Sequence, residues 1–382
     1  MNPPPGEKGA KDVGLEGWLP LLEPLHRAGI PVWLVGGAVR DVLEGRVPRD
    51  ADFVGGADVE SLRRCLPKAL PVGRQTPTLV LSLGKGRAPL EISGTRQGIL
   101  ADLERRDFSV NAMAWPVSPT GLEGEIVDPF GGREDLKKGR LRVPLASRDP
   151  FREDPVRVLR LLRFVSTRGY SVEGATLRMA REAIDDLPRV AGERRLREIA
   201  LFWEGEALDR VREALPEDFC GRVLSSGIFG KKLFPLSAEK GREAYARAAE
   251  ARAGSGLVRM WIFAWEAVGP EGGVEMRWGR SLWRGGGGSD LPFSRSDRHL
   301  LVALDLLKSV LEGWPAAGPL DPRSVKRLWR DPSQGEVARW VAEKLPTDLQ
   351  DPFWQWVRQE ERVGQRLSTD GFRSLPRYRS EY

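Results

Sequence analysis

The apolar pattern of this 382-residue chain changes once, near residue 149. Before that point, short runs of β-forming residues alternate with glycine-rich and polar turns, and we expect strands over 31–35, 78–83 and 89–93. Leucine spacing predicts two helices in the same part of the chain, over 16–28 and 59–66. The first part is therefore predicted to be a mixed α/β unit.

Beyond residue 149 only helical spacing remains, with apolar residues three and four positions apart. Glycines at 285–288 interrupt two helical blocks and predict a hinge or a flexible loop. The fold class is therefore predicted to be α+β. The expected helices cover 154–166, 175–187, 193–203, 207–215, 239–252, 296–312, 322–330, 335–345 and 353–366. The expected parts are a disordered tail at 1–14, a head at 15–148, a helical segment at 149–215 and a helical remainder at 216–382.

The rare residue types restrict the chemistry. Two cysteines, Cys65 and Cys220, cannot build a disulfide framework or a cysteine zinc site, which favours a reducing, cytoplasmic location. Two histidines, His26 and His299, exclude any site that needs several imidazoles. No apolar run is long enough to cross a membrane. The net charge of +6 permits a nucleic-acid partner without arguing for one.

A predicted strand ends in Gly36-Gly37, and a helix is expected directly after it. Glycine lets a backbone approach a phosphate closely, and the free N–H groups of a new helix point toward that phosphate. Arg40 falls in the first helical turn, where its planar guanidinium could clamp the same phosphates. Its neighbour Asp41 is expected to cap the helix or to pair within it.

Two carboxylates, Asp50 and Asp52, follow on the next expected strand. Residues two apart on a strand project from the same face, so both carboxylates are predicted to converge. Such a pair repels unless a cation lies between them, and Mg²⁺ prefers oxygen ligands of this kind. Glu91, on the strand at 89–93, is a candidate third carboxylate that could assist the metal or activate a hydroxyl. An isolated Asp-x-Asp is usually a solvated turn, but together with the glycine turn it predicts a metal-plus-triphosphate site.

The segment 105–114 is a second candidate site. Arg106 could add charge to a phosphate site, and Asn111 could orient a ribose or a backbone group. Taken alone, a helix cap followed by a turn is the simpler interpretation of this segment.

A third constellation occupies 152–164, where Glu153 or Asp154 is expected to open a helix with Pro155 in its first turn. Asp154 and Arg157 lie three apart and share one face. For an isolated helix, an intrahelical salt bridge with solvated arginines explains the pattern. The arginines that continue along a neighbouring stripe are Arg160 and Arg163.

The order of these motifs resembles that of the class II tRNA nucleotidyltransferases, the family of CCA-adding enzymes and bacterial poly(A) polymerases. The shared pattern is Gly-Gly-x-Val-Arg-Asp, Asp-x-Asp, Arg-Arg-Asp-Phe-x-x-Asn-Ala, Asp-Pro-x-Gly-Gly and Glu-Asp-Pro-x-Arg, over about residues 30–200. Residues 192–198 resemble the next family motif, a helix that braces the nucleotide-reading helix. The resemblance implies a polymerase-β-like head with a small mixed β-sheet, then a nucleotide-reading helical neck and a tRNA-binding helical body and tail.

The resemblance also implies a role for each candidate residue, in a reaction that joins CTP or ATP to the 3′ end of tRNA. Asp50 and Asp52 would bind catalytic Mg²⁺, while Gly36, Gly37, Arg40 and Arg106 would hold the triphosphate. Asp154 and Arg157 would read the incoming base, with help from Arg160 and Arg163 in nucleotide binding.

One Asp–Arg pair explains how C and A are selected without a nucleic-acid template. Cytosine and adenine both present an amino donor next to a ring-nitrogen acceptor, so an Asp accepts from the first and an Arg donates to the second. Uracil and guanine present the reverse order, and a site built on such pairing rejects mismatched analogues strongly.

The sequence departs from the family between the strand that ends in Thr-x-Arg and the Arg-Arg-Asp-Phe motif. A flexible segment usually separates the two, but residues 94–108 close the gap almost directly. Family members with this loop shortened tend to stop after CC, because the loop helps the site to switch to adenosine. Two activities stay open: a CC-adding enzyme that needs a separate A-adding enzyme, and a complete CCA-adding enzyme.

Two other interpretations are retained. A poly(A) polymerase shares nearly every motif but would add many residues from ATP alone. A non-catalytic RNA-binding relative would keep the shape of the head, although the presence of Asp50, Asp52 and Arg157 argues against it. The phosphohydrolase activity of many relatives needs a His and a His-Asp pair, and this sequence has no His-Asp pair.

Overall fold

The computed structural model describes residues 14–48, 50–73, 78–84, 88–145, 149–205 and 208–229, together with the helical residues 243–245, 248, 354, 355 and 358. It divides into two compact units, the first formed by Met1–Arg157 and Tyr170–Arg181, the second by Val158–Gly169 and Glu182–Tyr382. No helix within the described residues is long and apolar enough to span a membrane. The sequence predictions outside these residues are the tail at 1–14 (apart from Gly14), the hinge at 285–288, the helices at 296–312, 322–330 and 335–345, and most of those at 239–252 and 353–366.

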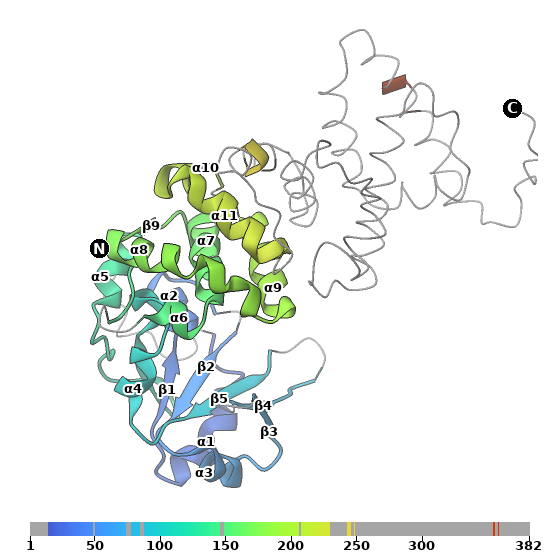
Figure 1. Cartoon of the computed structure of the whole chain (residues 1–382). Helices are drawn as coiled ribbons and strands as arrows, with labels where there is room; N and C mark the ends of the chain where they lie inside the picture. The colour runs from blue at the N-terminus through green and yellow to red at the C-terminus, as the bar shows by residue number, and fades with distance from the viewer. Residues whose placement is uncertain are drawn as a thin grey trace, which may run out of the picture. The chain divides into compact units, whose positions relative to one another are not determined.

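A seven-stranded mixed sheet is the centre of the first unit (Figure 1). Its strand order is β3-β4-β5-β2-β1-β6-β7, and β2 and β5 pair in parallel while the other neighbours are antiparallel. The α+β class and the mixed sheet predicted for the head are thus confirmed. The strands are β1 (Val32–Val35), β2 (Asp52–Gly55), β3 (Leu70–Val72), β4 (Thr78–Leu81), β5 (Leu90–Gly94), β6 (Ala114–Ser118) and β7 (Gly121–Leu122).

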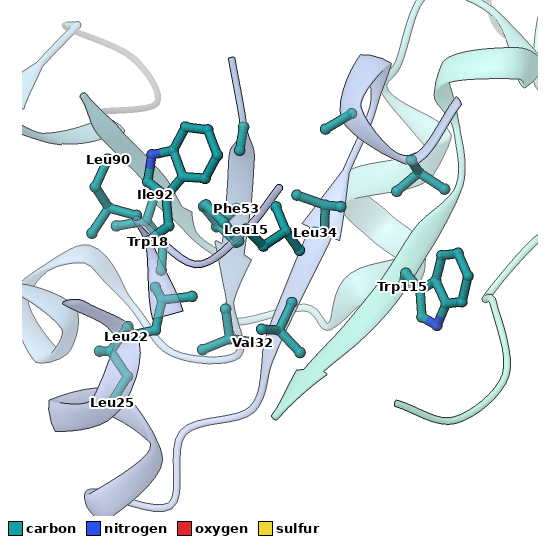
Figure 2. Packing of buried hydrophobic residues seen from close by; sticks show 14 of the residues in the cluster. Leu15, Trp18, Leu22, Leu25, Val32, Leu34, Phe53, Leu90, Ile92 and Trp115 are labelled. Atoms are coloured by element: carbon teal, nitrogen blue, oxygen red, sulfur yellow. The ribbon is translucent and has the colours of Figure 1, made fainter. Parts of the chain in front are cut away.

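One face of this sheet carries the main apolar core. Leu22 and Leu25 of α1 (Leu19–Arg27) pack with Leu34 of β1 and Phe53 of β2, all almost fully buried (Figure 2). Strand side chains alternate between the faces, so Val35 and Val54 belong to the opposite face, where they pack with Leu103 of α4 and Ala112. Asp52, two positions before Val54, therefore belongs to this second face. The other helices of the first unit are α2 (Gly37–Leu43), α3 (Val59–Cys65), α4 (Ile99–Glu104), α5 (Gly132–Lys137), α6 (Pro150–Glu153), the first residues of α7 (Val156–Arg168) and α8 (Gly174–Glu182).

The prediction that strands end before residue 149 is wrong at one place. A two-stranded parallel sheet pairs β8 (Arg140–Leu141) with β9 (Ser171–Val172). Each strand has only two residues, which is too short for any periodicity to be visible in the sequence. This pairing belongs to the first unit, as does α8 after it.

In the second unit, the rest of α7 packs with later helices. A Cβ added at Gly227 would lie 3.1 Å from Leu159 of α7 and 3.2 Å from Ile199 of α9, so the three helices meet closely there. Arg195 of α9 is fully buried, and its guanidinium donates to the carbonyl oxygens of Val190 (3.1 Å) and Gly227 (2.6 Å). The later elements are η4 (Ile184–Arg189), α9 (Gly192–Trp203), α10 (Leu208–Ala214) and α11 (Glu217–Phe229).

Both cysteines are free thiols. The buried side chain of Cys220 and its neighbour Asp218 raise the pKa of this thiol to about 12.

Candidate nucleotide and metal site

The Gly36-Gly37 turn connects β1 to α2. Gly36 has φ +70° and ψ −132°, a backbone conformation that residues with a Cβ rarely adopt. A Cβ added there would lie 2.6 Å from Nη1 of Arg106. Glycine is therefore required at this position for two reasons: its backbone angles are unfavourable for other residues, and the guanidinium of Arg106 occupies the space that a Cβ would need.

Arg106, near the start of the second candidate segment at 105–114, reaches this glycine turn. Its Nε and Nη2 donate to Oδ2 of Asp102, at 3.0 and 2.8 Å, from a position just beyond the C-terminal end of α4 (Ile99–Glu104). Both side chains are largely buried, with 21% of Arg106 and 14% of Asp102 exposed. Arg106 and the glycine turn, which the sequence predicted to share a site, are thus brought together.

Arg40 is held by a chain of hydrogen bonds that runs through the same motif. Its Nη1 donates to Oδ1 of Asn111 at 2.7 Å, and Nδ2 of Asn111 donates to Oδ1 of Asp107 at 2.9 Å. The side chain of Arg40 is buried, and its Nη2 also pairs with Asp41 at 3.2 Å, the pairing within the helix that was expected of Asp41. Arg40 thus links the glycine turn to the 3₁₀ turn η3 (Ser109–Asn111), while its contact with phosphate stays a prediction.

The three candidate carboxylates lie at one end of β2 and β5. Asp52 is exposed as the first residue of β2, and in the parallel register it lies directly beside Glu91 of β5. Paired residues in neighbouring strands project from the same face, so these two side chains share one face of the sheet. Asp52 also pairs with Val35, immediately before the glycine turn.

Asp50 is placed differently from the prediction. It is exposed and lies in a bend before β2, so strand alternation does not make it converge with Asp52. Among the residues that the structure describes, no group of three or more His, Cys, Asp and Glu side chains could hold a metal ion. Two aspartates close in sequence still match Mg²⁺, which is commonly bound by one or two carboxylates and completes its shell with water and substrate phosphate oxygens.

The third constellation is divided between two helices. The prediction that Glu153 or Asp154 opens a single helix is wrong, because a short helix, α6, ends at Glu153 and α7 begins at Val156. Asp154 lies between them in an extended conformation, because Pro155 disfavours a helical backbone at the residue before it. Asp154 and Arg157 stay joined through one backbone hydrogen bond, from Arg157 N to the carbonyl oxygen of Asp154 at 3.0 Å.

Arg157 lies near the arginine pair of the second motif. Its guanidinium donates to the backbone carbonyl oxygens of Arg105 and Pro150. The side chain is half-buried, and so is Asp154. The first unit therefore places Arg157, one of the two predicted base-reading residues, against Arg105, which directly precedes Arg106.

Arg160 and Arg163 belong to the second unit. Both pair with the buried Glu198 of α9, at 3.5 Å for Arg160 and 2.9 Å for Arg163. The guanidinium of Arg163 also lies 4.7 Å from the ring centre of Phe164. Glu198 lies in the segment 192–198, whose resemblance implies a bracing role, and it contacts the helix that this segment is expected to brace.

Sequence reasoning missed two acidic residues of the first unit that hold arginines, Asp102 and Asp135. Asp135 is fully buried and accepts hydrogen bonds from Ser109 at 2.6 Å, Arg140 at 2.8 Å and Arg142 at 2.9 Å. Burial raises its pKa, but these three donors together outweigh burial and lower the pKa below its ordinary value. The four-residue spacing of Asp102 and Arg106 could have been found, because residues four apart are neighbours on a helix.

Part of this chain is similar in sequence to known proteins. Residues 32–99 and 93–142 match the family model of the poly A polymerase head domain. A CC-adding tRNA nucleotidyltransferase of Halalkalibacterium halodurans is 38% identical over 190 residues, which are 49% of this chain and 48% of the relative. A CCA-adding enzyme of Lactococcus lactis subsp. cremoris is 34% identical over 193 residues, 46% of this chain and 47% of the relative. The chain thus spans about half the length of these curated relatives.

Solved structures share the fold over more of the chain. The Bacillus stearothermophilus CCA-adding enzyme in complex with CTP aligns with a TM-score of 0.64 and 24% identity, over 96% of this chain and 84% of that one. The Thermotoga maritima CCA-adding enzyme complexed with tRNA aligns with a TM-score of 0.60 and 24% identity, over 93% and 86%.

A mixed sheet with a glycine turn, an adjacent arginine and carboxylates at the start of β2 defines a nucleotidyltransferase head. More narrowly, the part of the chain that includes this site is similar to the poly A polymerase head domain and to CC- and CCA-adding tRNA nucleotidyltransferases.

Proposed function

We propose that the chain is a template-independent tRNA nucleotidyltransferase, which adds 3′-terminal C or A residues to tRNA from CTP and ATP and releases pyrophosphate. The observation that carries this proposal is the position of Arg106 against the Gly36-Gly37 turn, next to the start of β2 with Asp52. In this assignment residues 15–148 form the catalytic head, 149–215 a nucleotide-reading neck and 216–382 a tRNA-binding body and tail. The enzyme acts in the cytoplasm.

The glycine turn and the arginines hold the triphosphate. The backbone at Gly36 and Gly37 approaches the phosphates because no side chain intervenes, and Arg106 donates to their oxygens. Asp50 and Asp52 would hold Mg²⁺, which when bound would neutralise phosphate charge and make the primer hydroxyl more nucleophilic. Glu91, beside Asp52, assists at the same face of the sheet.

The reaction needs positioning more than covalent chemistry by the protein. The 3′-hydroxyl oxygen of the tRNA forms a bond to the α-phosphorus, and the bond from that phosphorus to the oxygen bridging to the β-phosphate breaks. The carboxylate of Asp154 accepts from the amino group of the base, and Arg157 donates to the adjacent ring nitrogen. Arg160 and Arg163, ordered by Glu198, assist in nucleotide binding.

A restricted, CC-adding activity is favoured by the connection between β5 and α4. Only residues 95–98 separate these elements, and Thr95 is buried, with its hydroxyl donating to the carbonyl oxygen of Gly98 at 3.0 Å. Arg96 in the same turn pairs with Asp58 at 3.0 Å. A short, hydrogen-bonded turn supports the absence of the loop that helps relatives to switch to adenosine. A separate enzyme would then add the final A.

The test is addition to tRNA that lacks its 3′ end, with CTP alone, ATP alone and both nucleotides, resolved at single-residue length. We expect two C residues from CTP and no further growth when ATP is present. Growth to CCA would reject the restricted form and keep the family activity, whereas a long tail made from ATP alone would identify a poly(A) polymerase.

The double variant Asp50→Ala/Asp52→Ala tests the catalytic assignment. We expect addition to fall at least about 10³-fold, with tRNA binding measured by filter retention unchanged. If addition persists in the double variant, these carboxylates do not hold the metal. If wild-type protein binds tRNA but adds nothing, the chain is a non-catalytic relative.

A further inference from the structure

We propose that Asp102 is a positioning residue that fixes the guanidinium of Arg106 over the Gly36-Gly37 turn and thereby sets the affinity for the triphosphate. The inference rests on the proposed function, because it needs a nucleoside triphosphate at this turn. It assigns to Asp102 an effect on nucleotide binding that is exerted only through Arg106.

Asp102 holds one edge of the guanidinium. Its Oδ2 accepts from both Nε and Nη2 of Arg106, at 3.0 and 2.8 Å, so the planar group is fixed in orientation and not only in position. The opposite side carries Nη1, which lies 2.6 Å from where a Cβ of Gly36 would be. Within the described part of the chain, no acceptor takes a hydrogen bond from this Nη1.

The same carboxylate is set in place by its own helix. Asp102 lies in α4, directly after the short turn at 95–98, and its Oδ1 also accepts from Nη2 of Arg105 at 3.4 Å. Only 14% of the Asp102 side chain is exposed, whereas 44% of Arg105 is exposed. The more buried of the two arginines therefore has the shorter, two-donor contact and faces the glycine turn.

Without Asp102 the long side chain of Arg106 would gain rotamers, and ordering it on a phosphate would cost entropy that the wild type has already lost. Loss of Asp102 should therefore weaken the binding of ligands that carry β- and γ-phosphates and should leave the binding of a ligand without them unchanged. If Asp102 had a purely structural role, its loss would instead weaken the binding of all ligands by the same factor.

The experiment compares wild type with Asp102→Ala, Asp102→Glu, Arg106→Ala and the double variant Asp102→Ala/Arg106→Ala. The KM for CTP and kcat are measured with tRNA lacking its 3′ end, and CMP is measured as a competitive inhibitor. Glu134→Gln is the matched control, because it removes an ion pair of the same four-residue spacing, to Lys138, on α5. Thermal unfolding of every variant is followed by circular dichroism.

We expect Asp102→Ala to raise the KM for CTP roughly tenfold, with kcat within about twofold and the inhibition constant of CMP unchanged. Asp102→Glu should recover part of the loss, since Glu can also pair with an arginine four residues on. In the double variant the loss should equal that of Arg106→Ala alone, because Asp102 acts only through that residue.

Three outcomes would overturn the inference: an unchanged KM in Asp102→Ala, an equal loss of CTP and CMP binding, or losses that multiply in the double variant. If Asp102→Ala fails to fold, the comparison of CTP with CMP in the glutamate variant decides in the same way. A wild type that shows no CTP-dependent addition rejects the proposed function itself, which is a separate result.

Discussion

At the scale of single residues, a substitution at Gly36 tests how closely the guanidinium of Arg106 approaches the backbone of the glycine turn. Gly36→Ala should lose about 1 kcal/mol of stability from its positive φ and should also weaken CTP binding, because the new Cβ would displace Arg106. Gly29 provides a matched control, since it has the same φ of +70° and nothing within 4 Å of an added Cβ. Chemical unfolding and CTP titration separate the two effects. Equal CTP affinity in the two variants would contradict the placement of Arg106.

The buried carboxyl of Asp135 should make the stability of the fold depend on pH. Folding lowers the pKa of this carboxyl below the ordinary value, so the ionised form stabilises the fold at pH values above the unfolded pKa, and this contribution disappears as the pH falls through the folded pKa. Asp135→Asn should cost about 3 kcal/mol at pH 7, because two arginines lose their shared buried partner.

The measurement is urea unfolding of wild type and Asp135→Asn between pH 7 and pH 3. The difference in free energy of unfolding should be constant at neutral pH and should shrink once the wild-type carboxyl is protonated. A difference that grows toward low pH would mean that folding raises the pKa of this carboxyl, the opposite of the direction expected.

At the scale of secondary-structure elements, the exposed and buried arginines of α9 have different roles. Arg195 is fully buried, and its guanidinium donates to two carbonyl oxygens. Arg195→Met should therefore destabilise the chain by about 3 kcal/mol, since it leaves those acceptors unsatisfied. Arg197→Ala, at an exposed position of the same helix, should change stability by less than about 0.5 kcal/mol. Urea unfolding followed at 222 nm compares the two, and equal losses would contradict the buried contacts.

The elements also show what a sequence can predict here. The apolar runs that become β1, β4 and β5 and the leucine spacing of α1 and α3 were sufficient, because each signal lies within one segment. β3 and β6 were missed, and each contains a proline, at 71 and 116, that weakens a strand signal. β8 and β9 exist only through their pairing over a distance of about thirty residues, which no local pattern reports.

For the candidate site, the sequence predicted residue types better than it predicted their contacts. Residue types that chemistry demands, such as paired carboxylates and glycines before a helix, were visible without a structure. The contacts of Arg40 with Asn111 and of Arg106 with Gly36 were not, because tertiary packing brings Asn111 and Arg106 to the glycine turn. Glu91 could be proposed from its strand, but its position beside Asp52 depends on a parallel register.

At the scale of the whole molecule, the charge balance predicts how tRNA binding responds to salt. The chain has 60 basic and 54 acidic residues, so the tRNA would be bound by local arginine and lysine contacts and not by a large net charge. A plot of log Kd against log salt concentration should be linear, with a slope of about 0.7–0.9 per phosphate contacted. Filter binding with wild type and with Asp50→Ala/Asp52→Ala should give the same slope. A flat plot would argue against binding through the phosphate backbone.

The parallel pairing of β2 with β5 has a consequence for how such a gene can change length. Asp52 and Glu91 face the same side of the sheet only while their register is kept. A shift of β5 by one residue relative to β2 would turn Glu91 toward the main apolar core, where Leu90 and Ile92 lie, whereas a shift of two residues would keep it on its own face, two positions along the strand. Length changes in this strand are therefore constrained by parity, and viable descendants should differ there by even numbers of residues.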